Sequence, residues 1–336
     1  MILHPGILAL LLGSLLTLAA VLVCAWIAIQ VLRYWAPDRA DQRQLSLERR
    51  TYLVSTLVNY ALAFSILSLP LFLFTVDDLH PLFVGAMCAT GSLNANPIGW
   101  TALFNKMLLV FFAGLWVVVN HYDLQSEDYP LTKIKSLALL ILVPLLVADF
   151  LLQAWYFLGL TPEIITSCCG SLFSSGSSGL AAEVSSFPLK QMMMVFYAGL
   201  AAYLLLLVIN LVSLRRLWRD LLAISALLLL FLGLAGTVSF ISLYVYELPS
   251  HHCPFDMLQA SSHFIGYPIY LGLFGTVLCS LVPSILERLG SFPGLVDVVA
   301  GARRRWLWSS LIFFVVFVLL TSWPVLFGRL SLRAFF

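Results

Sequence analysis

Cysteine and histidine are the residues of this chain whose types and spacing could do chemistry. The segment ELPSHHCPFDMLQ (247–259) holds His251, His252 and Cys253, and His263 follows it after a short interval. Imidazole and thiolate are good ligands for zinc, copper and haem iron. Neither the paired CxxC units of a zinc site nor a CxxCH haem-attachment sequence is present. A metal or haem is therefore a candidate cofactor, without a motif that specifies it.

The tetrapeptide CPFD has the form of a CPxC redox motif with Asp256 in place of the second cysteine. In such motifs the second thiol resolves a mixed disulfide. A local dithiol is therefore impossible here. If Cys253 is redox-active, its partner must be Cys88, Cys168 or Cys169 from another segment.

Four cysteines outside the apolar runs, Cys88, Cys168, Cys169 and Cys253, allow several interpretations. Structural disulfides that tie loops together are the first, followed by a metal or cofactor site, a redox-active pair and plain buried thiols. Vicinal cysteines rarely bond to each other, because the geometry is strained. We therefore expect a disulfide from Cys253 to another loop. The candidate metal or haem ligands are His80, His251, His252, His263 and Cys253.

Two charged residues fall inside apolar runs, Lys106 in LFNKMLL and Asp149 in LVADFLLQ. Charges in a lipid environment are costly and mark functional candidates. The two residues are expected at similar depth, where they can form an ion pair. Either the pair braces the helices, or it forms a proton or ligand site.

The elements that position these residues follow from the composition. Of the 336 residues, 61% are hydrophobic and 10% are charged, whereas soluble domains carry about 25% charged residues. Lipid must therefore surround most of the chain. The apolar runs are continuous and about 20 residues long, which favours membrane helices over a β-barrel.

The sequence predicts an all-α polytopic membrane protein, a bundle of about eight transmembrane helices in one membrane domain over residues 1–336. The expected spans are about 7–33, 52–75, 100–120, 134–157, 191–214, 220–245, 263–285 and 306–326. The connections about 76–99, 158–190 and 246–262 then lie on one side, and they carry the cysteines and histidines described above.

Positive charge predicts the orientation of the bundle. The exits of the odd-numbered spans hold 14 of the 18 Lys and Arg residues: Arg33, Arg39, Arg43, Arg49, Arg50, Lys133, Lys135, Arg215, Arg216, Arg219, Arg288, Arg303, Arg304 and Arg305. By the positive-inside rule these loops are cytoplasmic. Both termini and the Cys/His connections are then outside, on the periplasmic side of a bacterial cytoplasmic membrane.

Three functions remain open at this point. The first is redox or metal handling at the outer face, and the second is a transporter or permease-like subunit that uses Asp149 and Lys106. The third is a quinone-handling or structural subunit of an electron-transfer complex. No nucleotide-binding motif is present, and no basic-aromatic pattern suggests nucleic acid. Besides the lipid bilayer, the expected partners are membrane or periplasmic proteins. Whether the chain is an enzyme does not follow from its sequence.

Overall fold

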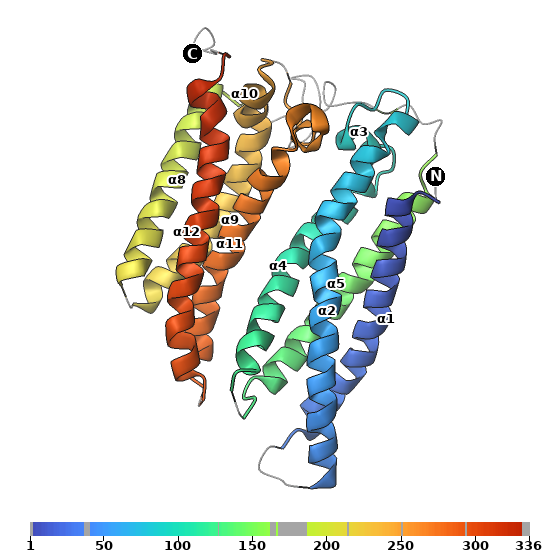
Figure 1. Ribbon diagram of the computed structural model, residues 1–336, viewed down its shortest axis with the longest axis vertical. Coiled ribbons are helices and arrows are strands. Elements are labelled where there is room, and N and C mark those ends of the chain that lie inside the picture. Colours follow the sequence, from blue (N-terminus) through green and yellow to red (C-terminus); the bar gives the residue numbers. More distant parts are fainter. Residues whose placement is uncertain are drawn as a thin grey trace. The chain divides into compact units, whose positions relative to one another are not determined.

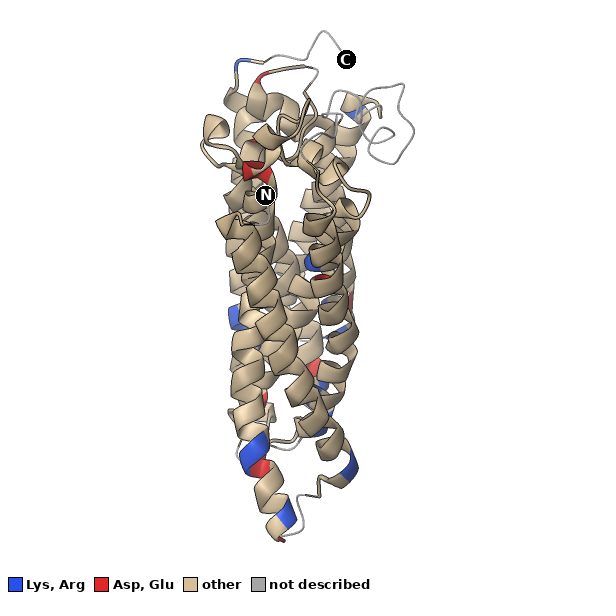
Figure 2. Cartoon of the chain, turned by 90° about the vertical axis from the view of Figure 1, so that its right-hand side faces the viewer, with Lys and Arg blue, Asp and Glu red and all other residues tan. Residues whose placement is uncertain are grey.

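A computed structural model describes residues 3–36, 41–126, 128–161, 166, 187–213, 215–249, 251–292 and 294–330. This part of the chain is helical and contains no strands. Eight of its helices are long and apolar enough to cross a membrane. Figure 2 shows few charged residues along these helices. The predicted all-α fold with about eight spans is confirmed, and the chain is a multi-pass membrane protein.

The chain separates into two compact units. The sequence alone predicts one membrane domain over the same residues. Unit 1 consists of Met1–Val76, Leu93–Thr161 and Gly290–Val299. Unit 2 consists of Asp77–Ser92, Pro162–Leu289 and Ala300–Phe336. The segment that ends one helix of unit 1 therefore continues into unit 2, and it carries Cys88 with it.

Unit 1 is built from four long helices, α1 (Pro5–Tyr34), α2 (Gln42–Asp78), α4 (Gly99–Asp123) and α5 (Thr132–Leu158). They run side by side in Figure 1, and α5 packs against both α1 and α4. Their buried faces meet in an apolar core that includes Val21, Leu62, Leu109, Trp116 and Leu142. This core separates the two groups of buried charges described below.

The second helix is longer than its predicted span of 52–75, because polar residues continue it at its N-terminal end. Asp41 precedes the helix, and its Oδ1 accepts a hydrogen bond of 2.8 Å from the backbone N–H of Gln44. This is the geometry of an N-cap, which satisfies a backbone donor that a helix start leaves open. Gln44 in turn donates to Glu48 one turn further on.

Unit 2 contains α8 (Leu189–Val212), α9 (Arg216–Gly236), α10 (Ser242–Tyr246), α11 (Gly266–Leu289) and most of α12 (Val296–Phe327). Figure 1 shows these helices grouped together. The helix α9 packs against α8 and α11. A π-helical segment, Thr237–Ile241, joins α9 to α10.

A buried group of hydroxyls links three helices of unit 2. The Tyr203 hydroxyl of α8 lies 2.7 Å from Ser280 Oγ of α11 and 2.6 Å from Ser310 Oγ of α12. The two serine oxygens are 2.8 Å apart. Polar contacts between membrane helices contribute about 0.6 kcal/mol each on average. These contacts join α11, which follows the loop 247–265 of the candidate site, to α8 and α12.

Candidate functional site

The loop between α10 and α11 begins and ends with strained backbone. Glu247 at its start has φ 56°, and His263 and Phe264 at its end both have φ 55°. Residues with a side chain rarely adopt this left-handed conformation, and such strain gathers at functional sites. Between these ends lie two short 3-10 helices, Asp256–Leu258 and Ala260–Ser262.

Three side-chain hydrogen bonds hold the middle of this loop. Two tyrosines bond to its backbone, and a histidine of the loop bonds to a neighbouring helical segment. The Tyr246 hydroxyl donates to the Cys253 carbonyl over 2.7 Å, and the Tyr270 hydroxyl donates to the Pro254 carbonyl over 2.6 Å. His252 Nδ1 donates over 2.9 Å to the carbonyl of Val238 in the π-helical segment. These bonds fix the backbone on both sides of the Cys253 side chain.

The second segment of the site follows α2 and leads into the short helix α3 (Ala89–Asn94). Gly85 has φ 85°, and a Cβ at this position would lie 2.7 Å from the Thr166 carbonyl oxygen. Only glycine avoids both the strain and the close approach. The Thr166 N–H also donates to the Val84 carbonyl over 2.9 Å. This turn places Cys88 at the start of α3.

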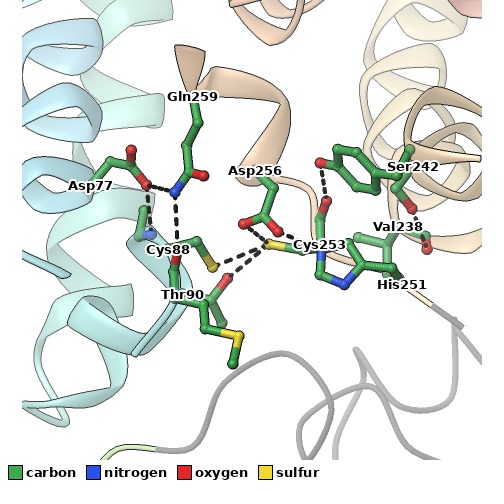
Figure 3. Close-up of polar contacts among 12 residues, drawn as sticks. Asp77, Cys88, Thr90, Val238, Ser242, His251, Cys253, Asp256 and Gln259 are labelled. Atoms are coloured by element: carbon green, nitrogen blue, oxygen red, sulfur yellow. Dashed lines mark hydrogen bonds and ion pairs between the residues drawn. The ribbon is translucent and has the colours of Figure 1, made fainter. Parts of the chain in front are cut away.

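These two loops bring Cys88 and Cys253 together (Figure 3). Their Sγ atoms lie 3.3 Å apart across 165 positions of sequence, and both residues are fully buried. A disulfide bond is about 2.05 Å long, so the sulfurs are not bonded in this structure. No disulfide therefore joins Cys253 to another described cysteine, although Cys88, one of the expected partners, is in contact with it.

Asp256 completes a group of three potential ligands with the two sulfurs. The Cys253 thiol donates to Asp256 Oδ1 over 3.2 Å. One ligand atom each from Cys88, Cys253 and Asp256 lies within 4.8 Å of the others. No other such group of three Cys, His, Asp or Glu side chains occurs in the described part of the chain. The Thr90 hydroxyl lies 3.6 Å from Cys253 Sγ.

The other oxygen of Asp256 contacts His251. The Nε2 of His251 donates a hydrogen bond to Asp256 Oδ2, and the imidazole packs edge-on against the Tyr246 ring with centroids 4.9 Å apart. Asp256 thus bridges a thiol and an imidazole, as Figure 3 shows. A carboxylate held in this way is oriented toward the sulfur on one side and the histidine on the other.

Asp77 and Gln259 tie three chain segments together beside the sulfurs. Asp77 Oδ1, at the end of α2, accepts hydrogen bonds from the Ala89 N–H at 2.9 Å and from Gln259 Nε2 at 3.1 Å. Gln259 Nε2 also donates to the Met87 carbonyl over 3.1 Å. The two cysteine loops are therefore linked by hydrogen bonds from Gln259 beside the sulfur contact.

The hydrogen bonds around Cys253 have a direction. Its thiol proton points to Asp256, so its sulfur is the acceptor in the contacts with the Cys88 thiol and the Thr90 hydroxyl. After proton loss to Asp256, the Cys253 sulfur would keep both of these donors. A thiolate is the reactive form of cysteine, both as nucleophile and as metal ligand. Cys253 is thus the thiol of the pair that donates a hydrogen bond to a carboxylate.

The other histidines among the candidate ligands lie outside this group of three. His252 faces the π-helical segment, and His263 is exposed at the strained end of the loop. His80 contacts the Asp77 carbonyl through Nδ1 at 2.5 Å. Cys168 and Cys169 lie outside the described residues. Of the proposed histidine ligands, only His251 approaches the sulfur site, and it does so through Asp256.

Lys106 and Asp149 form the ion pair that the sequence suggested, within unit 1. Lys106 Nζ lies 3.0 Å and 3.1 Å from the two oxygens of Asp149, and it donates to Ser68 Oγ over 3.2 Å. Both charged residues are buried. The three side chains come from α4, α5 and α2, so the pair joins three helices.

A second buried pair near the other ends of α4 and α5 was not identified from the sequence. Lys135 Nζ lies 2.7 Å from Asp123 Oδ2 and donates to Ser55 and Asn120. From the sequence, Lys135 is expected only as part of a positively charged loop. The sequence does contain a signal for this second pair. Each of the two helices, α4 and α5, carries a lysine and an aspartate, so a second pair can form between them in the same way as the first.

Apolar side chains separate the two ion pairs. On α4 the buried residues between them include Leu109, Ala113 and Trp116, and on α5 they include Leu139, Leu142 and Leu146. Charges and protons need polar groups or water to cross such a layer. Among the described residues of unit 1, the two ion pairs are therefore separated by apolar side chains.

Comparison with known proteins gives no match, whether against protein-family models, curated proteins or solved structures.

Proposed function

We propose that this chain is a membrane component for thiol–disulfide exchange, with Cys88 and Cys253 as its redox pair. The observation that carries the proposal is the 3.3 Å contact between two buried sulfurs, one of which donates a hydrogen bond to Asp256. Closing a disulfide requires the sulfurs to approach by about 1.3 Å. Small side-chain rotations supply such a movement.

The exchange partner in this proposal is a disulfide, carried by a protein or a small molecule. Asp256 accepts the Cys253 proton, and the thiolate attacks one sulfur of the incoming disulfide, which breaks and releases one partner thiolate. The Cys88 sulfur, after losing its proton, attacks Cys253 in the mixed disulfide and displaces the second partner thiolate. Two electrons pass to the partner, and its two thiolates take up the two protons.

Access to the pair requires motion of the loops. Both cysteines are fully buried, and thiol exchange depends on access as well as on thiolate character. The loop 247–265, strained at both ends, is the segment whose displacement would expose Cys253. Exchange gated in this way is slow with small thiols and disulfides, but gating does not change the equilibrium between the reduced and the oxidised pair.

The positive charge at the exits of the odd-numbered spans indicates on which side of the membrane the site lies. On this ground we propose that the Cys88 and Cys253 loops lie on the periplasmic side of a bacterial cytoplasmic membrane. That compartment is oxidising and contains proteins that exchange disulfides. The partners we propose are therefore membrane or periplasmic proteins that carry an exchangeable disulfide.

The contacts offer less support for the other two functions. The hydroxyls of Tyr246 and Tyr270 are already donated to backbone carbonyls, which leaves them unavailable to a quinone in this conformation. The Lys106–Asp149 pair joins three helices beside an apolar layer, an arrangement that favours bracing over transport. Of the three candidate functions, thiol–disulfide exchange therefore has the most support from the contacts.

The test is equilibration of the purified full-length protein in detergent with mixtures of reduced and oxidised glutathione. Cysteines are then alkylated, and peptides are mapped by mass spectrometry. We expect a reversible Cys88–Cys253 disulfide in the Cys168→Ser/Cys169→Ser background, with a midpoint between fully reducing and fully oxidising mixtures. Cys279→Ser is the matched control, because this thiol is buried within α11.

Two results would overturn the proposal. One is a Cys88–Cys253 pair that stays reduced in every mixture while the protein is folded. The other is a stable bond between Cys253 and Cys168 or Cys169 in the wild-type chain, with Cys88 remaining a thiol throughout.

A further inference from the structure

We propose that the reduced Cys88–Cys253 pair, together with Asp256, binds a thiophilic divalent metal ion of the Zn²⁺ class. This inference uses the same two sulfurs as the proposed function but does not depend on thiol–disulfide exchange. The ligand set also differs from the one the sequence suggested, since Cys88 and Asp256 take the places expected for histidines. The two buried sulfurs and a carboxylate oxygen already lie within 4.8 Å of one another.

Two of the distances between the three atoms, those from Cys253 Sγ, are close to those of a zinc site. With Zn–S near 2.3 Å and Zn–O near 2.1 Å, tetrahedral angles require about 3.8 Å between sulfurs and about 3.6 Å between sulfur and oxygen. The structure has 3.3 Å between the sulfurs and 3.2 Å between Cys253 Sγ and Asp256 Oδ1. Each separation must widen by roughly 0.5 Å, which side-chain rotation permits.

The charges and the surroundings of the three atoms also suit a divalent ion. Metal binding displaces the two thiol protons, so two thiolates and a carboxylate face a charge of +2. His251 holds the far oxygen of Asp256, as the outer partners of metal ligands commonly do. The Thr90 hydroxyl lies 3.6 Å from Cys253 Sγ, and zinc sites with three protein ligands commonly take water as the fourth ligand.

Metal binding and disulfide formation exclude each other at this site, because each uses both sulfurs. Oxidation of the pair would therefore release the ion, and a bound ion would protect the pair from oxidation. The site would hold its metal only while the two cysteines are reduced. Redox state would thereby control metal occupancy.

The test titrates Zn²⁺ into the reduced full-length protein in detergent, against a chromophoric chelator. The Cys168→Ser/Cys169→Ser background removes the other thiols of the loops predicted to be outside. We expect one Zn²⁺ per chain, and at least a 100-fold loss of affinity after oxidation, in Cys88→Ser and in Cys253→Ser. Cys24→Ser and Cys279→Ser, which remove buried thiols within α1 and α11, should bind as before.

A second measurement needs no variant at the site and so avoids any failure of a variant to fold. Zn²⁺ should slow alkylation of Cys88 and Cys253 at least tenfold, whereas the rates at Cys24 and Cys279 should not change. Unchanged Zn²⁺ affinity in Cys88→Ser, or in the oxidised protein, would overturn the inference. So would equal alkylation rates with and without Zn²⁺.

The outcomes separate this inference from the proposed function. Zn²⁺ binding without any reversible Cys88–Cys253 disulfide would remove the exchange function and leave the metal site. A reversible disulfide without Zn²⁺ binding would remove only the metal site.

Discussion

Cys88 Sγ and Cys253 Sγ lie 3.3 Å apart, although 165 positions separate them in the sequence. Two tyrosine hydroxyls hold the backbone around Cys253, and Gln259 with Asp77 holds the Cys88 loop against it. The sulfur contact is thus supported from several sides.

Asp256→Asn should slow oxidation of the cysteine pair. The change keeps the size of the side chain but removes the carboxylate that accepts the Cys253 proton. General bases typically contribute at least 100-fold to a rate, so we expect a fall of about that size in diamide-driven oxidation at pH 7. The rate is followed by quenched alkylation and mass spectrometry. Asp78→Asn, which changes an exposed carboxylate at the end of α2, is the control, and equal rates in the two variants would contradict the role.

His251 and His252 should differ in their effects although they are neighbours in sequence. His251→Ala removes the hydrogen bond that orients Asp256, so we expect oxidation to slow several-fold. His251→Gln, which retains an N–H donor, should recover part of that rate. His252→Ala loses the bond to the Val238 carbonyl and should cost about 1 kcal/mol of stability with little change in rate. The prediction fails if the two alanine variants behave alike.

Gln259→Leu should loosen the two cysteine loops. The amide donates to both Asp77 and Met87, and its loss leaves these acceptors without that donor. We expect about 1–3 kcal/mol of destabilisation, seen as a lower midpoint of thermal unfolding in detergent. The yield of the Cys88–Cys253 crosslink should fall as well. Gln125→Leu, which removes an exposed amide bonded to His121, should leave the crosslink yield unchanged.

The helices were predictable from the sequence, but the cluster was not. Apolar runs of membrane-spanning length fix the number of helices, because the cost of exposing backbone to lipid leaves few alternatives. The approach of Cys88 to Cys253 instead depends on the turn at Gly85 and on strained residues such as His263. Loop conformations of this kind have no periodic signal. For the same reason, Asp256 was seen as a missing cysteine rather than as a partner of the thiol.

The Lys106–Asp149 pair separates bracing from transport, because the two roles predict opposite effects on folding. Removing one partner leaves a charge buried with no counterion, which typically costs 3–5 kcal/mol. Lys106→Met alone and Asp149→Leu alone should therefore lower the midpoint of thermal unfolding strongly. Replacing both with apolar residues of similar size is often neutral, so the double variant should recover most of the stability.

The transport role makes a different prediction for the same variants. A transport site requires an Asp149→Leu protein that folds normally and has lost function, and a double variant that is no better. The Lys135–Asp123 pair supplies the internal comparison, since it has the same chemistry and also contacts a serine of α2. Because an apolar layer separates the pairs, their effects on stability should add within about 0.5 kcal/mol. Strong coupling between the two pairs would instead indicate that they act as one path through unit 1.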